Sequence, residues 1–405
     1  MSLEILSPAG DLERLKAAVD FGADAVYLAG KQFGMRTAAG NFDIINLKKG
    51  IDYAHKNNVK VYVTLNTIPH NNELVNLPEF LEVLNDLKAD AAIVSDVGVI
   101  KNVKKYAPNL NLHISVQSGI VNYESANFYH ELGAQRVVLA RELNLEEISE
   151  IRAKTSEDLE LEAFVHGAMC VSFSARCLLS SYMTGRDANR GDCAQPCRWS
   201  YALVEEKRPG QYFPVTETKE GTYILNANDL CMAEHLNKIK QAGVNSIKIE
   251  GRAKSHYYVA AITNTYYLAV NSLNNAKNLD AWQLEENIKK ELLKISHRGY
   301  STGFYFGKPE NSQTYENAGY VRDYSVAAIV KDYKDGMIIA EMKNKFSKGI
   351  TIDCLEPKKL PFEFVVENLY DENDNEIESA IHPTMLVKIP FKNPVKKGSL
   401  LRMKS

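Results

Sequence analysis

The sequence lacks the signals that mark membrane and secreted proteins. No run in its 405 residues approaches the roughly 20 consecutive apolar residues that a membrane-spanning helix needs. No signal-peptide pattern is present at the start either, because residues 1–9 lead directly into a predicted strand. We therefore expect a cytoplasmic protein that does not insert into a membrane.

Several catalytic and nucleotide-binding motifs are also missing. The segment after the first predicted strand reads Ser-Pro-Ala-Gly-Asp at residues 7–11, without the G-x-G-x-x-G pattern that cradles a dinucleotide. The sequence contains neither an H-E-x-x-H zinc helix nor a G-x-S-x-G nucleophile turn. These absences argue against a dehydrogenase and against two large classes of hydrolase.

The charge balance shows no overall excess of basic residues. There are 48 Lys and Arg against 51 Asp and Glu, which gives a formal net charge of −3. Basic residues gather locally in two places: Arg186, Arg190 and Arg198, and then, with no acidic residue among them, Lys388, Lys392, Lys396, Lys397, Arg402 and Lys404. Either group is a candidate for contact with phosphate.

Cysteine is scarce but concentrated. Four of the six cysteines, Cys170, Cys177, Cys193 and Cys197, fall within 28 residues, at gaps of six, fifteen and three. Their neighbours are polar residues and glycines, whereas a structural cysteine usually lies alone in an apolar run. In a cytoplasmic protein this pattern favours metal binding over a disulfide framework. The other two, Cys231 and Cys354, are expected to be structural.

The spacing also bears on the kind of metal site. Structural zinc sites favour Cys-x2–4-Cys pairs, and only Cys193 and Cys197 approach that spacing. Longer and uneven gaps suit the wider iron–sulfur cluster, which is the favoured interpretation, with zinc left open. A thiol–imidazole pair of Cys170 with His166 would leave three cysteines unexplained, and ranks below both.

Most of the chain alternates short apolar runs with amphipathic helical patterns. Eight strands are predicted, over residues 4–7, 25–28, 60–65, 91–95, 112–116, 136–139, 161–165 and 246–249. Helices are predicted over residues 11–21, 46–57, 77–88, 125–132, 145–154, 229–242 and 257–272. Eight strands separated by helices predict a parallel (β/α)8 barrel.

The alternation breaks at two places, which divide the chain. A long insertion over residues 167–221 follows the seventh strand and holds the four clustered cysteines. We assign residues 1–275 to the barrel with this insertion and residues 276–319 to a helical connector. From about residue 320, short alternating runs and a Lys-Asp-Gly turn at residues 334–336 predict a small all-β, barrel-like domain over residues 320–405.

Polar residues follow the predicted barrel strands, where the carboxyl ends of the strands meet at one mouth. They include Asn66, Asp96, Gln117, Arg141, Glu142, His166, Glu250 and Arg252, with Arg36, Lys254 and Tyr257 nearby in the topology. Three guanidinium groups, those of Arg36, Arg141 and Arg252, would suit an acidic ligand. Pairing of these arginines with Glu142 or Glu250 for structure is the alternative.

Several segments resemble the signature of peptidase family U32, the collagenase-like proteases. They are EAFVHGAMC at residues 162–170, CLLS at 177–180, CRW at 197–199, NDLC at 228–231, IKIEGR at 247–252, LSPAGD at 6–11 and GADAVY at 22–27. The resemblance covers the whole predicted barrel, and the β domain fits the longer members. It points to the branch of tRNA uridine hydroxylation proteins.

The resemblance implies a function that the peptidase name hides. Relatives carry out oxygen-independent hydroxylations, and members of this branch form 5-hydroxyuridine at the tRNA wobble position, with prephenate implicated as the hydroxyl source. By the same resemblance, Cys170, Cys177, Cys193 and Cys197 would hold a [4Fe–4S] cluster. We expect catalytic roles for His166 and Glu250, and substrate-binding roles for Arg36, Gln117, Arg141, Arg252, Lys254 and Tyr257.

The expected partners are tRNA and a small acidic co-substrate, and a paralogous subunit is a further candidate. Four alternatives stay open: a collagenase-like peptidase, a hydroxylase of a ribosomal RNA base, a hydroxylase of a quinone precursor, and a non-catalytic, zinc-stabilised RNA-binding protein.

Overall fold

The structure is a computed structural model. It describes residues 2–35, 40–170, 177–199, 227–307 and 320–405, and the backbone of four two-residue strands: β8 (Leu203–Val204), β9 (Tyr212–Phe213), β10 (Glu217–Thr218) and β11 (Gly221–Thr222).

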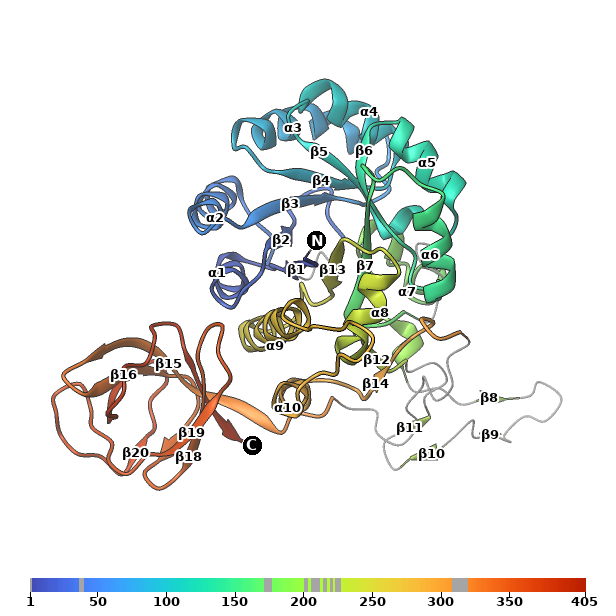
Figure 1. The fold of residues 1–405 in the computed structure, drawn as a ribbon. Coiled ribbons are helices and arrows are strands. Elements are labelled where there is room, and N and C mark those ends of the chain that lie inside the picture. The colour runs from blue at the N-terminus through green and yellow to red at the C-terminus, as the bar shows by residue number, and fades with distance from the viewer. Residues whose placement is uncertain are drawn as a thin grey trace.

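Eight parallel strands form a closed barrel (Figure 1). They are β1 (Glu4–Pro8), β2 (Ala25–Leu28), β3 (Lys60–Leu65), β4 (Ala91–Val94), β5 (Asn111–Ile114), β6 (Ala134–Val138), β7 (Glu160–Ala168) and β13 (Ser246–Ile249). The barrel is closed because β13 pairs in parallel with both β1 and β7. The predicted barrel is confirmed, with strand ends within two residues of those predicted except where β7 continues to Ala168.

Helices surround the barrel on the outside (Figure 1). They are α1 (Leu12–Asp20), α2 (Ile44–Lys56), α3 (Leu77–Asp86), α4 (Val97–Tyr106), α5 (Tyr123–Glu131), α6 (Leu145–Ala153), α8 (Leu236–Gln241) and α9 (His256–Asn274). Asp11 caps α1, and Asn144 forms a reciprocal capping box with Glu147 at the start of α6. Each cap fixes the point at which the chain turns from the barrel mouth into a helix.

The prediction of a helix starting at Asp229 is wrong. Residues Asp229–Cys231 form the strand β12, which pairs antiparallel with the mouth end of β7 and in parallel with β14 (Tyr300–Ser301). The buried carboxylate of Asp229 accepts a hydrogen bond from Arg298 at 2.7 Å. This long-range pairing overrides the helical pattern, and the chain becomes helical only at the 3-10 helix Ala233–His235, which leads into α8.

A buried ionic cluster lies inside the barrel, at the end opposite the mouth. Arg136 of β6 is 2% exposed and pairs with Glu4 at 2.6 Å, with Glu160 at 2.6 Å and with Glu162 at 3.0 Å. Lys248 pairs with the second oxygen of Glu162 at 2.8 Å. The cluster therefore connects strands β1, β6, β7 and β13 through charged hydrogen bonds.

The C-terminal domain is an antiparallel half-barrel, as the sequence predicted. Its strands are β15 (Tyr324–Lys334), β16 (Met337–Met342), β18 (Thr351–Leu355), β19 (Phe362–Val365), β21 (Leu386–Pro390) and β22 (Leu400–Lys404), in the order β19-β18-β22-β15-β16-β21. The predicted hairpin is confirmed, since Asp335 and Gly336 have φ of 52° and 75° between β15 and β16. A small pair, β17 (Phe346–Ser347) and β20 (Ser379–Ala380), completes the domain.

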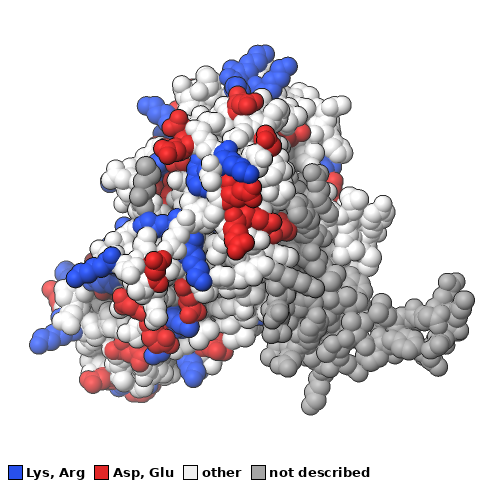
Figure 2. Space-filling model, turned by 45° about the vertical axis from the view of Figure 1, so that its right-hand side comes forward, with Lys and Arg blue, Asp and Glu red and all other residues white. Residues whose placement is uncertain are grey.

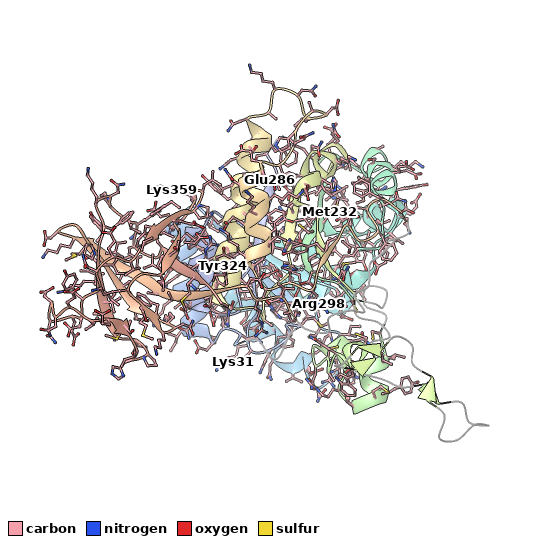
Figure 3. The ribbon with its side chains drawn as sticks, turned by 90° about the horizontal axis from the view of Figure 1, so that it is seen from below. Lys31, Met232, Glu286, Arg298, Tyr324 and Lys359 are labelled. Atoms are coloured by element: carbon pink, nitrogen blue, oxygen red, sulfur yellow. The ribbon has the colours of Figure 1, made fainter. Side chains whose placement is uncertain are left out.

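Figure 3 shows α10 (Glu286–Lys294), with Glu286 labelled, beside the C-terminal domain, where Tyr324 and Lys359 are labelled. Buried charges join the two: Arg402 of β22 is fully buried and pairs with Glu291 of α10 at 2.7 Å and with Asp353 of β18 at 2.8 Å. Lys294 pairs with the same two carboxylates, and its ammonium group lies over the ring of Tyr324. The guanidinium of Arg402 is therefore enclosed in the interface, so its prediction as a phosphate contact is wrong.

Candidate active site at the barrel mouth

The carboxyl ends of the strands surround a pocket at the barrel mouth. Its lining comprises Tyr27, Met35, Thr64, Asn66, Ser115, Val116, Gln117, Arg141, Phe164, Lys248, Glu250 and Arg252. The structure thus brings together four residues that the sequence nominated, namely Gln117, Arg141, Glu250 and Arg252, along with Asn66. Asp96 does not line this pocket, because its side chain caps α4 by accepting from Val99 N.

Two arginines contribute positive charge to this pocket. Arg252 is 2% exposed, and its Nη1 donates to Thr64 Oγ1 at 3.0 Å. Arg141 Nη1 donates to the carbonyl of Ala168 at 3.1 Å, and its guanidinium lies over the ring of Phe164. The Nε of Arg141 is buried and has no hydrogen-bond partner among the described residues. Such a donor favours a ligand that supplies an acceptor.

Lys248 is a third cation of the pocket, and sequence reasoning did not include it among the site residues. It is 5% exposed, and its ammonium lies 2.8 Å from Glu162 and 4.6 Å from the ring centroid of Tyr27. A lysine in the middle of the apolar strand Ser246–Ile249 was the available signal, because a buried lysine is rare without a charged partner. The pocket floor therefore carries a paired ammonium group.

A close approach of two backbones shapes the mouth beside Glu250. Gly167 has φ of 104°, and a Cβ added there would lie 2.5 Å from the carbonyl oxygen of Glu250. The Glu250 amide donates to His166 O at 2.8 Å, and the hydroxyl of Tyr258 donates to Glu250 O at 3.0 Å. Only glycine fits this position, so the end of β7 can lie directly against the end of β13.

His166 is buried beside the pocket and does not line it. Its exposed fraction is 1%, and the rings of Tyr258, Tyr266 and Tyr300 surround it at 6.3, 5.6 and 5.3 Å between centroids. Burial, with a smaller contribution from the nearby Lys254 charge, lowers the pKa of His166 to about 3. The imidazole is therefore neutral near pH 7 and out of reach of a substrate in the pocket.

This burial predicts a loss of stability in acid. The unfolded chain binds a proton at His166 near pH 6.5, whereas the folded chain binds it only near the pKa of about 3. Acidification from pH 7.5 to pH 5 should therefore lower the free energy of unfolding by about 2 kcal/mol through this residue. Urea denaturation at both pH values should show a smaller loss for His166→Gln, and equal losses in the two proteins would contradict the prediction.

The remaining nominated side chains lie away from the pocket lining or outside the described residues. Lys254 lies over the rings of Tyr258 and Tyr320, at 5.2 and 3.9 Å from their centroids. Tyr257 faces the interface with the C-terminal domain, where its hydroxyl donates to Lys294 O at 2.8 Å and Arg402 lies over its ring. Arg36 falls outside the described residues.

The four clustered cysteines flank short turns beyond the end of β7, near α7 (Leu179–Thr184). All four are free thiols; Cys170 is exposed and the others are partly buried. Gln195, with φ of 56°, turns its amide toward Cys193 Sγ at 3.4 Å. Asn189 Nδ2 donates to the carbonyl of Cys177 at 3.2 Å. Within the described ranges, no three His, Cys, Asp or Glu side chains lie close enough together to hold a metal ion.

Carboxylates already pair with two arginines of this segment. Arg186 lies 2.6 Å from Asp192, and Arg190 lies 2.6 Å from Glu73. The side chain of Arg198 lies outside what the structure describes. On the face shown in Figure 2, Lys and Arg are scattered among Asp and Glu. A phosphate would therefore compete with existing partners at Arg186 and Arg190.

No helix in the described part of the chain is long and apolar enough to cross a bilayer. The family model described as peptidase family U32 matches residues 10–315, and the model of the U32 C-terminal domain matches residues 322–402.

Three relatives are similar over most of their own length. The chain is 34% identical over 402 residues to tRNA hydroxylation protein P1 of Bacillus subtilis, covering 98% of this chain and 94% of the relative. It is 36% identical over 397 residues to tRNA hydroxylation protein P of Escherichia coli, covering 88% and 86%. An uncharacterized protease of Methanocaldococcus jannaschii is 44% identical over 340 residues, covering 82% and 81%. The chain belongs to peptidase family U32.

Proposed function

We propose that this protein is an enzyme that hydroxylates uridine in tRNA at carbon 5, at the wobble position. The similarity to proteins named for tRNA hydroxylation, over 98% of this chain in one case, carries the proposal. The mouth pocket supports it, because the pocket holds buried cations, a carboxylate and a polar amide. Its Arg141 also donates to the carbonyl of Ala168, two residues before Cys170.

The cations favour an acidic co-substrate, and we propose prephenate, a dicarboxylate. Arg141 and Arg252 would bind its carboxylates, together with Arg36, which lies outside the described residues. The unpartnered Nε of Arg141 supports this role. A guanidinium binds a carboxylate through two parallel hydrogen bonds, which would orient the co-substrate in the pocket. Gln117 lines the same pocket and would contact the same ligand or the base.

We propose Cys170, Cys177, Cys193 and Cys197 as ligands of a [4Fe–4S] cluster. The chemistry of the donor set fits, because four free thiols occur in one short segment. The thiols would have to draw together to bind the cluster, since no three of them lie close enough in the described ranges to hold a metal ion. An amide directed at Cys193 Sγ is the kind of hydrogen bond that tunes a bound thiolate. Such a cluster would supply one-electron chemistry at the mouth. The sulfur of Cys193 would then bind the cluster from the turn in which it already accepts the hydrogen bond of the Gln195 amide.

Among the proposed catalytic residues, Glu250 lines the pocket and is the candidate for proton transfer. The burial of His166 changes the role that we propose for it. A neutral imidazole packed among three tyrosines would hold the end of β7 in place rather than exchange protons with a substrate. Lys254, which does not line the pocket, would contact the RNA outside it. Tyr257 contributes to the interface with the C-terminal domain instead of binding substrate.

The direct test is the content of modified uridine in tRNA. Deletion of the gene, together with any paralogue, should remove 5-hydroxyuridine and its derivatives from digested tRNA analysed by mass spectrometry. The wild-type gene should restore them, whereas Arg252→Gln should not. Unchanged levels in the deletion strain would reject the proposal.

The named protease relative favours one alternative, a peptidase of the collagenase type. Protein purified without air would then degrade gelatin and lose this activity in Cys170→Ala. Absence of gelatin degradation, with normal tRNA hydroxylation, would reject the alternative.

A further inference from the structure

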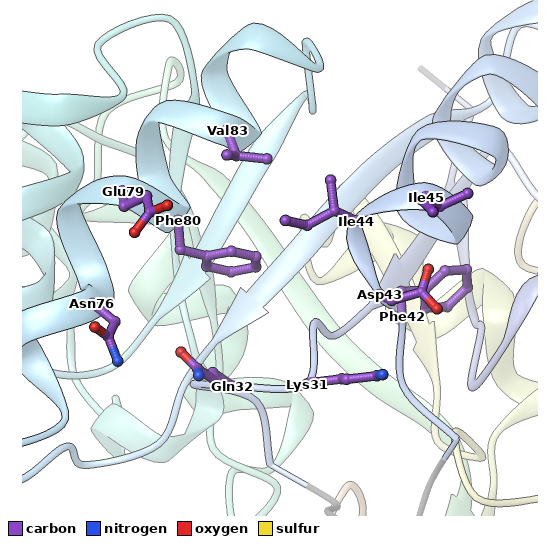
Figure 4. Close-up of a pocket in the computed structure, with 10 residues that line it drawn as sticks. All are labelled: Lys31, Gln32, Phe42, Asp43, Ile44, Ile45, Asn76, Glu79, Phe80 and Val83. Carbon is purple, nitrogen blue, oxygen red and sulfur yellow. The ribbon is translucent and has the colours of Figure 1, made fainter.

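A second pocket opens on the outer rim of the barrel mouth (Figure 4). It lies between the N-terminal ends of α2 and α3, which both begin on the mouth side. Its lining residues are Lys31, Gln32, Phe42, Asp43, Ile44, Ile45, Asn76, Glu79, Phe80 and Val83, and its volume is about 580 Å³. We call it the rim pocket. None of these residues lines the mouth pocket.

The rim pocket has an apolar slot. The ring of Phe80 from α3 and the side chain of Ile44 from α2 point toward one another across its centre (Figure 4). Ile44 is 54% exposed and the adjacent Ile45 is 68% exposed, although both are large apolar residues at the start of a helix. Apolar surface of this kind that is lined up at a pocket, rather than scattered, marks a binding site.

Polar groups surround the slot. The side chains of Lys31, Gln32, Asn76 and Glu79 form no hydrogen bond or ion pair within the described ranges, so an ammonium, two amides and a carboxylate can face a ligand. By contrast, Asp43 is occupied, because its side chain accepts from the backbone amide of Asn46 at the start of α2. Hydrogen-bond donors and acceptors therefore lie together at the edge of the apolar slot.

One loop separates the rim pocket from the mouth pocket. Lys31 and Gln32 of this loop line the rim pocket, and Met35, three residues later, lines the mouth pocket. Between them, Phe33 stacks on Phe80 with ring centroids 6.0 Å apart and an interplanar angle of 28°. The hydroxyl of Thr67 donates to Phe33 O at 3.1 Å and holds the loop against the segment that follows β3. A ligand that spans this loop would occupy both pockets.

We propose that the rim pocket binds the base of a nucleotide adjacent to the one that enters the mouth. This inference rests on the proposed function, since it requires a single-stranded segment of tRNA as the substrate. A base drawn into the mouth leaves the stack, so its neighbour loses a stacking partner. The ring of Phe80 replaces that partner, and the amides of Gln32 and Asn76 contact the edge of the base.

The test uses RNA anticodon stem–loops with a uridine at the modified position, and the full-length protein. One probe keeps all bases, and two others are abasic at the nucleotide before or after that uridine. We expect wild-type protein to bind one abasic probe about tenfold more weakly than the intact probe. Phe80→Leu, which keeps an apolar side chain against Phe33 but removes the stacking face, should bind all three probes alike.

Matched exposed variants separate recognition from folding. Asn76→Ala should weaken binding of the intact probe, whereas Val75→Ala, at the neighbouring position and 76% exposed, should not. The inference is overturned if wild-type protein binds the intact and abasic probes equally, or if Phe80→Leu keeps the wild-type preference. Selective binding without uridine hydroxylation would reject the proposed reaction but keep single-stranded tRNA as the ligand, which is the part of the proposed function that this inference requires.

Discussion

Replacement of Arg136 by methionine should lower the free energy of unfolding by about 3–5 kcal/mol. The guanidinium is 2% exposed and pairs with Glu4, Glu160 and Glu162. These carboxylates raise the pKa of Arg136 although burial lowers it, and Arg136 in turn lowers the pKa of Glu4 against the effect of burial. Without the cation, buried negative charges repel one another in the barrel interior.

Urea denaturation at pH 7.5 measures this loss. Lys60→Met is the matched control, because Lys60 also pairs with Glu4, at 3.8 Å, but is 60% exposed. We expect at most about 1 kcal/mol for that surface pair. The deficit of Arg136→Met should also shrink in acid, since protonation removes the repulsion. A wild-type free energy of unfolding for Arg136→Met would show that the ionic cluster does not stabilise the barrel.

If Cys170, Cys177, Cys193 and Cys197 hold the proposed cluster, replacement of any one of them by serine should abolish both the cluster and the proposed tRNA hydroxylation. A serine oxygen is a poor ligand for iron compared with a thiolate, and three thiolates leave one iron exposed. Iron and sulfide analysis without air should give about four of each per wild-type chain and much less in the variants.

Cys354→Ala is the control for this experiment, because Cys354 is buried in the C-terminal domain and burial raises the pKa of its thiol to about 12. That variant should keep its iron and its activity. One zinc per wild-type chain without sulfide would contradict the proposal of a cluster. Full activity of Cys193→Ser would show that Cys193 is not required for the reaction.

The barrel could be predicted from sequence because its strands are buried on both faces. Runs such as Ala25–Leu28 and Ala91–Val94 are wholly buried, so each reads as a short, continuous apolar segment. The strand β12 could not be predicted in this way. Its three residues acquire their conformation from pairing with β7 and β14 and from the contact of Asp229 with Arg298. Such long-range partners leave no local pattern.

Positions at the strand ends predicted part of the mouth. Gln117, Arg141, Glu250 and Arg252 directly follow barrel strands, and the closed barrel brings them together. The direction of a side chain is harder to predict from sequence. Side chains alternate along a strand, but the pairing of β13 with β7 shifts register between Lys248 and Ile249, so that His166 lies opposite Ile249. Lys248 therefore lines the pocket and His166 does not.

The order of strands in the C-terminal half-barrel has a consequence for how the protein is made. The strand β22 is the last in sequence, yet it lies between β18 and β15 and pairs with both. During synthesis, the pair β18–β19 and the group β15–β16–β21 therefore each keep an unpaired strand edge until residues 400–404 have left the ribosome. The same residues carry Arg402 to Glu291 of α10. The half-barrel therefore assembles and docks onto the (β/α)8 barrel in the same step, after β22 has been made. Until then its unpaired strand edges are prone to aggregation.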